Sequence, residues 1–201
     1  MTLRRLGAAA ACVLLLAAIV GMHRLVPDST QRMGPISTRG DVGELIDAGG
    51  LTVTVSKVRL TRVLAEEGFS PGPPARTDGI WVVLTATLTD DWQATAHAET
   101  FLEAADGTKY YVSERGDLST RLTEDLSTEP GIPRRGRIVF EIPPGQLAGS
   151  VVRIGRNETI SGGGRLSPEA VVDLGLDAEA ARTLVDDAAP KLTIGPVEYG
   201  P

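Results

Sequence analysis

The sequence predicts an all-β protein, an antiparallel sandwich of short strands, on three observations. Residues 79–89 form an apolar run that has no proline, no internal glycine and no charge. Further short runs with alternating apolar and polar side chains lie on both sides of it, separated by turn residues. No long helical pattern interrupts these runs. Short alternating strands joined by turns are typical of two sheets packed over one core.

The run at 79–89 is expected to be the central strand of this sandwich. Successive side chains of a strand point to opposite faces. One parity holds only apolar residues, which are Ile80, Val82, Leu84, Ala86 and Leu88. We therefore expect this parity to face the core, with Trp81 and Val83 on the opposite face.

The first strand of the sandwich is predicted over 51–63. Its apolar parity switches after Val55, which predicts a β-bulge near Ser56-Lys57; two short strands joined by a kink would also explain the switch. Residues 66–78 contain three prolines and are expected to form a loop. Phe69 at the tip of this loop is a candidate contact for a partner, because long loops often carry function.

The next elements are a hairpin and two further strands. Asp106-Gly107 separates the strand-like runs 100–104 and 109–113, and this dipeptide is typical of a hairpin turn. Residues 114–129 are expected to cross between the sheets. Strands follow at 137–142 and 150–154. The predicted sandwich domain spans residues 49–160.

Residues 161–201 are expected to form a helical extension. Ser167-Pro168-Glu169 has the residue types that begin a helix. Asp177 is expected to cap a second helical turn through Val185, and residues 191–194 are a possible edge strand.

The N-terminus is predicted to anchor the chain in the cell membrane. Arg4 and Arg5 precede an uncharged run of 17 residues, 6–22, and a spanning helix needs roughly 17–25 residues. Small residues are poorly placed for signal-peptide cleavage, so an uncleaved signal-anchor over 1–26 is favoured over a cleaved signal. The two arginines predict that the bulk of the chain lies outside the cytoplasm. Residues 27–48 are expected to be a tether.

A family resemblance supports the sandwich. Pro130-Gly131, followed by Gly136 and the run 138–143, resembles a stretch of the DUF4352, or telokin-like, immunoglobulin-like domains. The central strand and the hairpin around Asp106-Gly107 follow in the same order, and the resemblance covers about residues 50–156. It implies an immunoglobulin-like antiparallel β-sandwich exported from the cytoplasm, of the kind found in Gram-positive bacteria. It implies no catalytic residues.

Composition excludes several kinds of function. The formal net charge of −6 argues against nucleic-acid binding. Cys12 is the only cysteine, so no disulfide forms within one chain. Asp90, Asp91 and His97 lie near one another in sequence without the spacing of a metal site. We therefore predict no metal, no cofactor and no catalytic residues.

The function predicted from these observations is non-enzymatic: a membrane-anchored module that binds a protein of the cell envelope. Sheet edges and loops of sandwiches bind proteins readily, for example by strand addition. The alternative is a small-ligand or cell-wall glycan-binding module. Such a site needs exposed aromatic rings, for which Trp92 and Tyr110 are the candidates.

Overall fold

The structure is a computed structural model that describes residues 3–25, 34–67, 72–91, 98–115, 121–123, 130–156 and 166–200. The chain divides into two units, Met1–Gly34 and Pro35–Pro201. The first unit contains α1 (Leu3–Leu25), whose side chains at 11–22 are exposed. The sequence predicts a membrane-spanning helix over 1–26, but among the described residues no helix is both long and apolar enough to cross a membrane.

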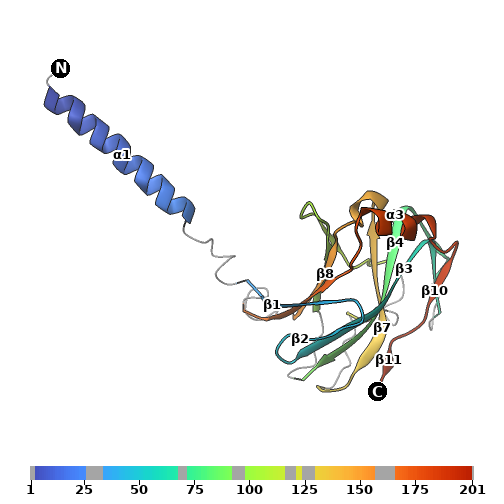
Figure 1. Cartoon of the computed structure of the whole chain (residues 1–201). Helices are drawn as coiled ribbons and strands as arrows, with labels where there is room; N and C mark the ends of the chain where they lie inside the picture. The colour runs from blue at the N-terminus through green and yellow to red at the C-terminus, as the bar shows by residue number, and fades with distance from the viewer. Residues whose placement is uncertain are drawn as a thin grey trace. The chain divides into compact units, whose positions relative to one another are not determined.

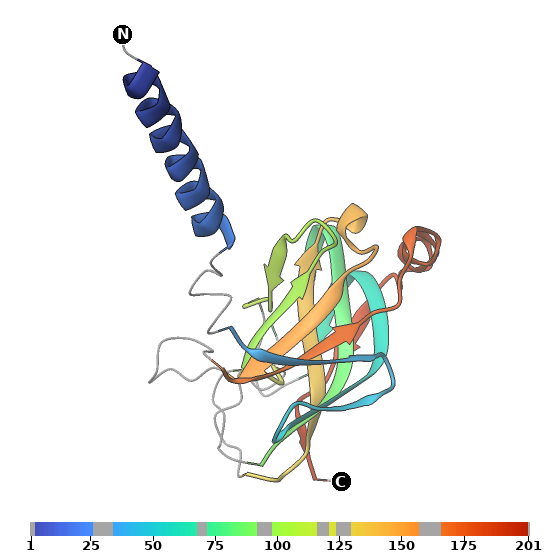
Figure 2. The ribbon, with the colours of Figure 1, turned by 60° about the vertical axis from the view of Figure 1, so that its left-hand side comes forward.

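The second unit is a β-sandwich of two sheets (Figures 1 and 2). Sheet A has the order β1 (Ile36–Asp41), β9 (Pro168–Asp173), β8 (Val151–Arg156), β5 (Ala98–Glu103) and β6 (Lys109–Tyr111). Sheet B has the order β10 (Leu192–Ile194), β3 (Leu51–Glu66), β4 (Ala75–Asp90), β7 (Arg134–Ile142) and β11 (Glu198–Tyr199), and β2 (Leu45–Asp47) also pairs with β3. The described residues of this unit also include the 3-10 helix η2 (Pro144–Gln146) and the helix α3 (Ala178–Asp186).

The core confirms the predicted central strand. β4 lies between β3 and β7 in sheet B. Its inner side chains are fully buried: Ile80, Val82, Leu84, Ala86 and Leu88. Sheet A faces them with Leu102, Val152, Ile154, Ala170 and Val172. Burying each large aliphatic side chain is worth about 1.5–3 kcal/mol, so these two rows hold the sheets together.

Two local predictions are also confirmed. The β3–β4 register shifts between Val55 and Lys57, as the parity switch requires, and a second shift follows between Thr61 and Val63. The predicted hairpin joins β5 to β6, and the Thr108 amide donates to Asp106 Oδ1 at 2.9 Å. The predicted loop 66–78 is shorter than expected, because β4 already begins at Ala75.

The sandwich is not purely antiparallel, which corrects the prediction. β1 pairs with β9 in parallel, and β10 pairs with β3 in parallel. Each pair joins segments that lie far apart in the chain, so no local pattern in the sequence indicates its direction. The expected tether 27–48 also contains β1 and β2. β2 has one buried apolar residue, Ile46, which is too short a signal to be recognised as a strand.

The C-terminal region differs from its prediction in one element. The expected helix at Ser167-Pro168 is instead β9, an interior strand of sheet A. Pairing with strands on both sides, together with burial of Ala170 and Val172, outweighs the local helix-start signal. The helix capped by Asp177 is confirmed as α3, and the edge strand at 191–194 as β10. The sandwich therefore extends well beyond residues 49–160 at both ends.

A buried ion pair joins the two sheets at one end of the core. Arg156 of β8 donates from Nε to Asp90 Oδ2 at 3.0 Å and from Nη2 to Asp90 Oδ1 at 2.6 Å. The side chains of Arg156 and Asp90 are 7% and 4% exposed. The forked guanidinium matches both carboxylate oxygens, so each charge is paired although both are removed from water.

Replacing Asp90 by Asn is expected to destabilise the sandwich by about 3–5 kcal/mol, because it leaves the buried Arg156 charge without its counter-charge. The matched control is Glu141→Gln, which breaks the exposed Arg115–Glu141 pair (3.2 Å) and is expected to cost less than about 1 kcal/mol. Urea unfolding of both variants measures the difference. Equal losses of stability would show that the Asp90–Arg156 pair does not connect the sheets energetically.

Candidate functional site

The strand β1 presents an open edge of sheet A. The Ile36 amide donates to the Ser167 carbonyl at 2.8 Å, so the backbone of Ile36 faces β9 in the parallel pair. Since alternate residues of a strand direct their amide and carbonyl groups to the same neighbour, those of Ser37 and Arg39 point away from β9. Among the described residues, no strand pairs with this side of β1.

The C-terminal end of β1 is closed by its own chain. The Asp41 amide, which points the same way as that of Arg39, donates to Glu44 Oε2 at 3.0 Å. Gly40 is required here, because a Cβ would lie 2.7 Å from both Glu44 Oε2 and Ile46 Cγ1. The open part of the edge is therefore the backbone of Ser37 to Arg39.

Two exposed aliphatic side chains lie at the start of β1 and just before its partner β9. Ile36 is 62% exposed and Leu166 is 60% exposed. The Ile36 amide bonds to Ser167, the residue that follows Leu166 in the chain. Leu166 has a φ of 55°, the only positive φ of a non-glycine residue among those described. That conformation costs about 1–2 kcal/mol for an L-residue, and such strain is found most often at binding and active sites.

A polar network links four strands across the neighbouring outer face of sheet A. Ser37 Oγ donates to Glu169 Oε2 at 2.5 Å, and Arg153 Nη1 donates to the same oxygen at 2.8 Å. Arg153 Nε also donates to Glu103. Partial burial, the largest single effect, lowers the pKa of Arg153, but the hydrogen bonds and charges of Glu103 and Glu169 together raise it above its usual value. β1, β9, β8 and β5 are thus tied together across their outer side chains.

A cavity of about 370 Å³ lies beside the closed end of β1. Its lining consists of Arg39, Gly40, Asp41, Glu44, Val151, Val171 and Asp173. Three carboxylates and one guanidinium give the lining a negative balance. When a strand is added to a sheet edge, pockets beside the edge select alternate side chains of the incoming strand. This cavity suits a basic or polar side chain.

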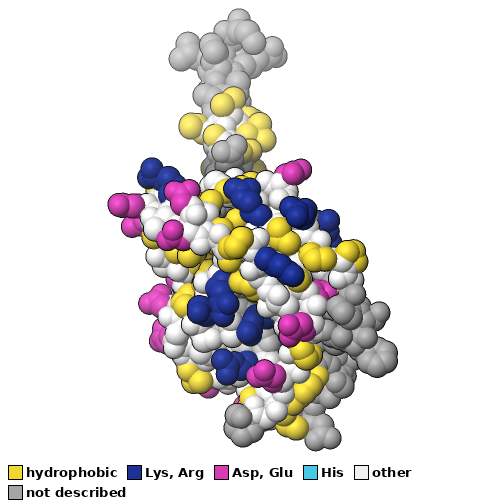
Figure 3. All heavy atoms as spheres, turned by 90° about the vertical axis from the view of Figure 1, so that its right-hand side faces the viewer, with side chains coloured by type: hydrophobic (Ala, Val, Ile, Leu, Met, Phe, Trp, Pro, Cys, Tyr) yellow, Lys and Arg dark blue, Asp and Glu magenta, His cyan; other side chains and the backbone are white. Residues whose placement is uncertain are grey.

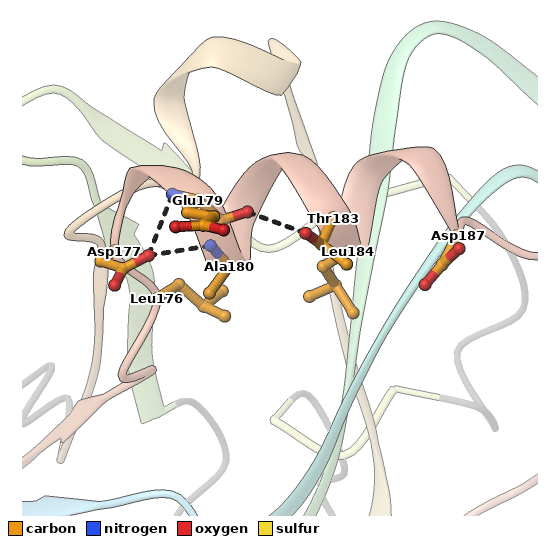
Figure 4. A pocket seen from close by; sticks show the side chains of 7 residues that line it. All are labelled: Leu176, Asp177, Glu179, Ala180, Thr183, Leu184 and Asp187. Atoms are coloured by element: carbon orange, nitrogen blue, oxygen red, sulfur yellow. Dashed lines mark hydrogen bonds between the residues drawn. The ribbon is translucent and has the colours of Figure 1, made fainter.

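A second hollow, of about 440 Å³, lies along α3 (Figure 4). Its apolar floor is Leu176, Ala180 and Leu184, and acidic side chains stand at its rim. Asp177 Oδ1 already accepts from the amides of Glu179 and Ala180, at 2.9 and 2.8 Å. Because the Asp177 carboxylate already caps α3, this hollow offers a ligand fewer hydrogen-bonding groups than the β1 edge does. Across the described residues, no group of three or more His, Cys, Asp or Glu side chains is arranged to hold a metal ion.

Of the three residues predicted from the sequence to contact a partner or ligand, the structure describes only Tyr110. Phe69 and Trp92 lie outside the described residues, as does His97. Tyr110 is half-buried and packs on the core beside Leu102, its partner on β5.

The other aromatic residues are also separated. Tyr111 is 60% exposed, and its ring centroid lies 5.8 Å from that of Phe101 on the outer face of sheet A. Trp81 is fully buried on sheet B, with the Arg115 guanidinium 5.5 Å from its ring centroid. Tyr110 and Trp81 therefore do not form one open aromatic groove.

Sequence reasoning missed the β1 edge altogether. The strand that pairs with β1 lies more than 130 positions further along the chain, so its pairing leaves no local pattern. The available signal was the short run Ile36-Ser37-Thr38 after Gly34-Pro35, which is compatible with a strand but too short to predict one.

No protein-family model matches the chain, and no curated protein sequence matches it. Two solved structures are similar. An uncharacterized β-sandwich protein from Clostridium difficile 630 is 13% identical, with a TM-score of 0.44, over 73% of this chain and 98% of that chain. The yjhA protein from Bacillus subtilis is 18% identical, with a TM-score of 0.47, over 67% of this chain and 98% of that chain.

Replacing Leu166 by Gly is expected to leave the free energy of unfolding within about 1 kcal/mol of the parent value. The relief of a positive φ, about 1–2 kcal/mol, is offset by the larger backbone entropy that Gly loses on folding, about 0.5–1 kcal/mol. Leu166→Ala keeps the strain and serves as the control. A loss of several kcal/mol on Leu166→Gly, measured by urea unfolding, would mean that this side chain is packed within the protein and is not available to a partner.

Proposed function

We propose that the second unit is a non-enzymatic protein-binding module of the cell envelope, which takes a strand of another protein along β1. The observation that supports this proposal is the open backbone edge of Ser37 to Arg39 beside the exposed Ile36 and Leu166. An open edge offers backbone hydrogen bonds without requiring any change in the sheet. Each such bond contributes about 0.5–1.5 kcal/mol net.

The edge lacks most of the devices that prevent strand addition. Proteins usually protect an edge with proline, a bulge, lysine or a covering loop. β1 contains no proline or lysine, and its register with β9 runs without a shift from Ile36 to Asp41. The one charged side chain beside the open backbone is Arg39. The edge is therefore suited to association.

The lining of the cavity indicates the chemistry of the partner strand. An added strand places alternate side chains over the outer face of sheet A. One such side chain would enter the cavity beside Asp41, Glu44 and Asp173, and their charge favours a basic group. An aliphatic side chain nearer the start of β1 would cover Ile36 and Leu166. We propose a partner segment with both features.

We further propose that the sandwich is immunoglobulin-like and of the DUF4352 type, and that the chain is held at the cell membrane, outside the cytoplasm, by its N-terminal segment. Support for the location comes from the uncharged run 6–22 behind Arg4 and Arg5, and from the exposure of the apolar side chains at 11–22. An apolar helix surface of this kind marks a site that contacts a membrane or another protein.

A second candidate function, binding of a small ligand or a cell-wall glycan, is favoured by one observation. Tyr111 is exposed beside Phe101, and Lys109 Nζ lies 4.3 Å from the centroid of the Phe101 ring. An exposed ring beside a cation provides one stacking surface for a sugar. The β1 edge offers more contacts, so strand binding is preferred.

The proposal predicts that Arg39→Pro abolishes partner binding while the sandwich stays folded. Proline removes the Arg39 amide, which points away from β9 and takes no part in that ladder. The control is Arg39→Ala, which removes the same side chain but keeps the amide.

The measurement is site-specific photo-crosslinking from position 36 of the full chain in its native host. A crosslinked protein is expected in the parent and in Arg39→Ala, and more than tenfold less of it in Arg39→Pro. Equal yields from the Ala and Pro variants would show that the edge backbone is not used. Thermal unfolding of both variants confirms that they are folded.

The membrane proposal predicts that Leu15→Arg moves the protein from the membrane fraction to the soluble fraction. A charge at the centre of a membrane-inserted helix costs about 2.5–3.5 kcal/mol on insertion scales. Leu15→Ile is the control and is expected to stay with the membrane. Cell fractionation followed by immunoblotting measures the ratio, and an unchanged ratio for Leu15→Arg would contradict anchoring by this segment.

A further inference from the structure

The outer face of sheet B carries four basic residues, two on each side of β4. Lys57 and Arg59 lie on β3, and Arg135 and Arg137 lie on β7. The registers align Lys57 with Thr85 and Arg137, and they align Thr87 with Arg135. β4 therefore places Val83, Thr85 and Thr87 between the two basic rows. Figure 3 shows Lys and Arg side chains gathered on this side of the molecule.

These four basic side chains belong to a chain that is acidic overall. The formal net charge is −6, yet among the described residues no carboxylate forms a salt bridge with Lys57, Arg59, Arg135 or Arg137. Burial lowers the pKa of Arg137, and the like charges of Arg59 and Arg135 lower it further. The negative charge of Glu198 acts in the opposite direction and raises this pKa. Repulsion among these side chains costs stability, and a bound anion would remove it.

The geometry of this face suits a chain better than a small molecule. Adjacent strands lie about 4.8 Å apart, so the two basic rows are separated by about 9.6 Å, and residues two apart on one strand are about 6.6 Å apart. The cavity that Arg137 lines, together with Arg115 and Arg121, has a volume of only about 10 Å³. That is no more than about one water molecule needs, so a phosphate group cannot enter it. A ligand that contacts both rows would lie across the face and carry several negative charges.

The side chains available also indicate the kind of anion. A guanidinium binds phosphate through two parallel hydrogen bonds, and the half-buried Thr87 lies beside Arg135 between the rows. Trp81, the aromatic residue of β4 on this face, is fully buried, so it offers no stacking surface for nucleobases. The chemistry therefore favours a polymer of phosphodiesters without bases.

We propose that the outer face of sheet B binds a linear alkyl phosphodiester polymer between the Lys57–Arg59 row and the Arg135–Arg137 row. This activity is separate from strand addition at β1, which lies at the edge of the other sheet. Each cation that contacts a phosphate releases counterions, so binding weakens steeply as salt is added.

The test compares the affinity of the full chain for poly(glycerol phosphate) in two double variants. Arg59→Gln with Arg137→Gln removes one cation from each row. Arg182→Gln with Lys191→Gln removes the same charge from exposed side chains on α3 and just before β10. The first double variant is expected to bind at least about tenfold more weakly, and the slope of log affinity against log salt falls by about two. The second is expected to bind like the parent chain.

Thermal unfolding separates a binding role from a structural one. Because Arg59 and Arg137 repel each other, their replacement by Gln is expected to leave Tm unchanged or to raise it. A lowered Tm together with equal affinities of the two double variants would show that the arginines are structural, and would overturn the proposal.

Three alternative ligands complete the test. Equal affinity for poly-L-glutamate would overturn the preference for phosphodiesters. Tighter binding to phosphatidylglycerol vesicles would assign the face to a lipid surface, and tighter binding to single-stranded DNA would assign it to nucleic acid; either would overturn the proposal. Crosslinking from position 36 does not depend on these residues, so failure here leaves the proposal for β1 standing, and the reverse also holds.

Discussion

Burial of the inner face of β4 against sheet A is the constraint on which the rest of the structure depends. β4 pairs with β3 along one side and with β7 along the other, so its backbone hydrogen bonds are satisfied along most of its length. Its inner side chains meet those of β5, β8 and β9. The β-bulge after Val55 keeps β3 in register with this inner face. The Asp90–Arg156 pair ties the end of β4 to sheet A by a charge interaction that water cannot replace.

The inner faces of the two sheets form the core, and the two outer faces differ in charge. On sheet A, Arg153 is neutralised by Glu103 and Glu169, and Glu169 also accepts a hydrogen bond from Ser37 of β1. On sheet B, Lys57 of β3 and Arg137 of β7 face each other across Thr85, with Arg59 and Arg135 in the same two rows. A face with satisfied charges contributes to stability, whereas a face with unsatisfied like charges reduces it. This difference makes the outer face of sheet B a candidate for binding, and the outer face of sheet A a support for its own edge.

The two proposed sites use different physical properties of a sheet. The β1 edge offers unpaired backbone groups, which recognise the extended backbone of another chain regardless of its sequence, and the cavity beside it adds selectivity. The outer face of sheet B offers side-chain charge, whose strength depends on salt and on the number of anions in reach. One sandwich can carry both sites, because the edge of one sheet and the face of the other do not overlap.

The sequence by itself determined the strands whose apolar side chains alternate: β4, β3 with its bulge, the β5–β6 hairpin and β7. These elements follow from the alternation of apolar residues and from the turn residues between them, both of which are local features of the sequence. Only the tertiary structure decided that 168–173 is a strand rather than a helix, and that β1 lies beside it in parallel. Those outcomes come from hydrogen bonds and burial between segments more than 130 positions apart, which outweigh the local helix-start signal. The edge proposed at β1 depends on such pairing, whereas the face proposed on sheet B follows from the register of β3, β4 and β7. For that reason local patterns in the sequence could not locate the β1 edge.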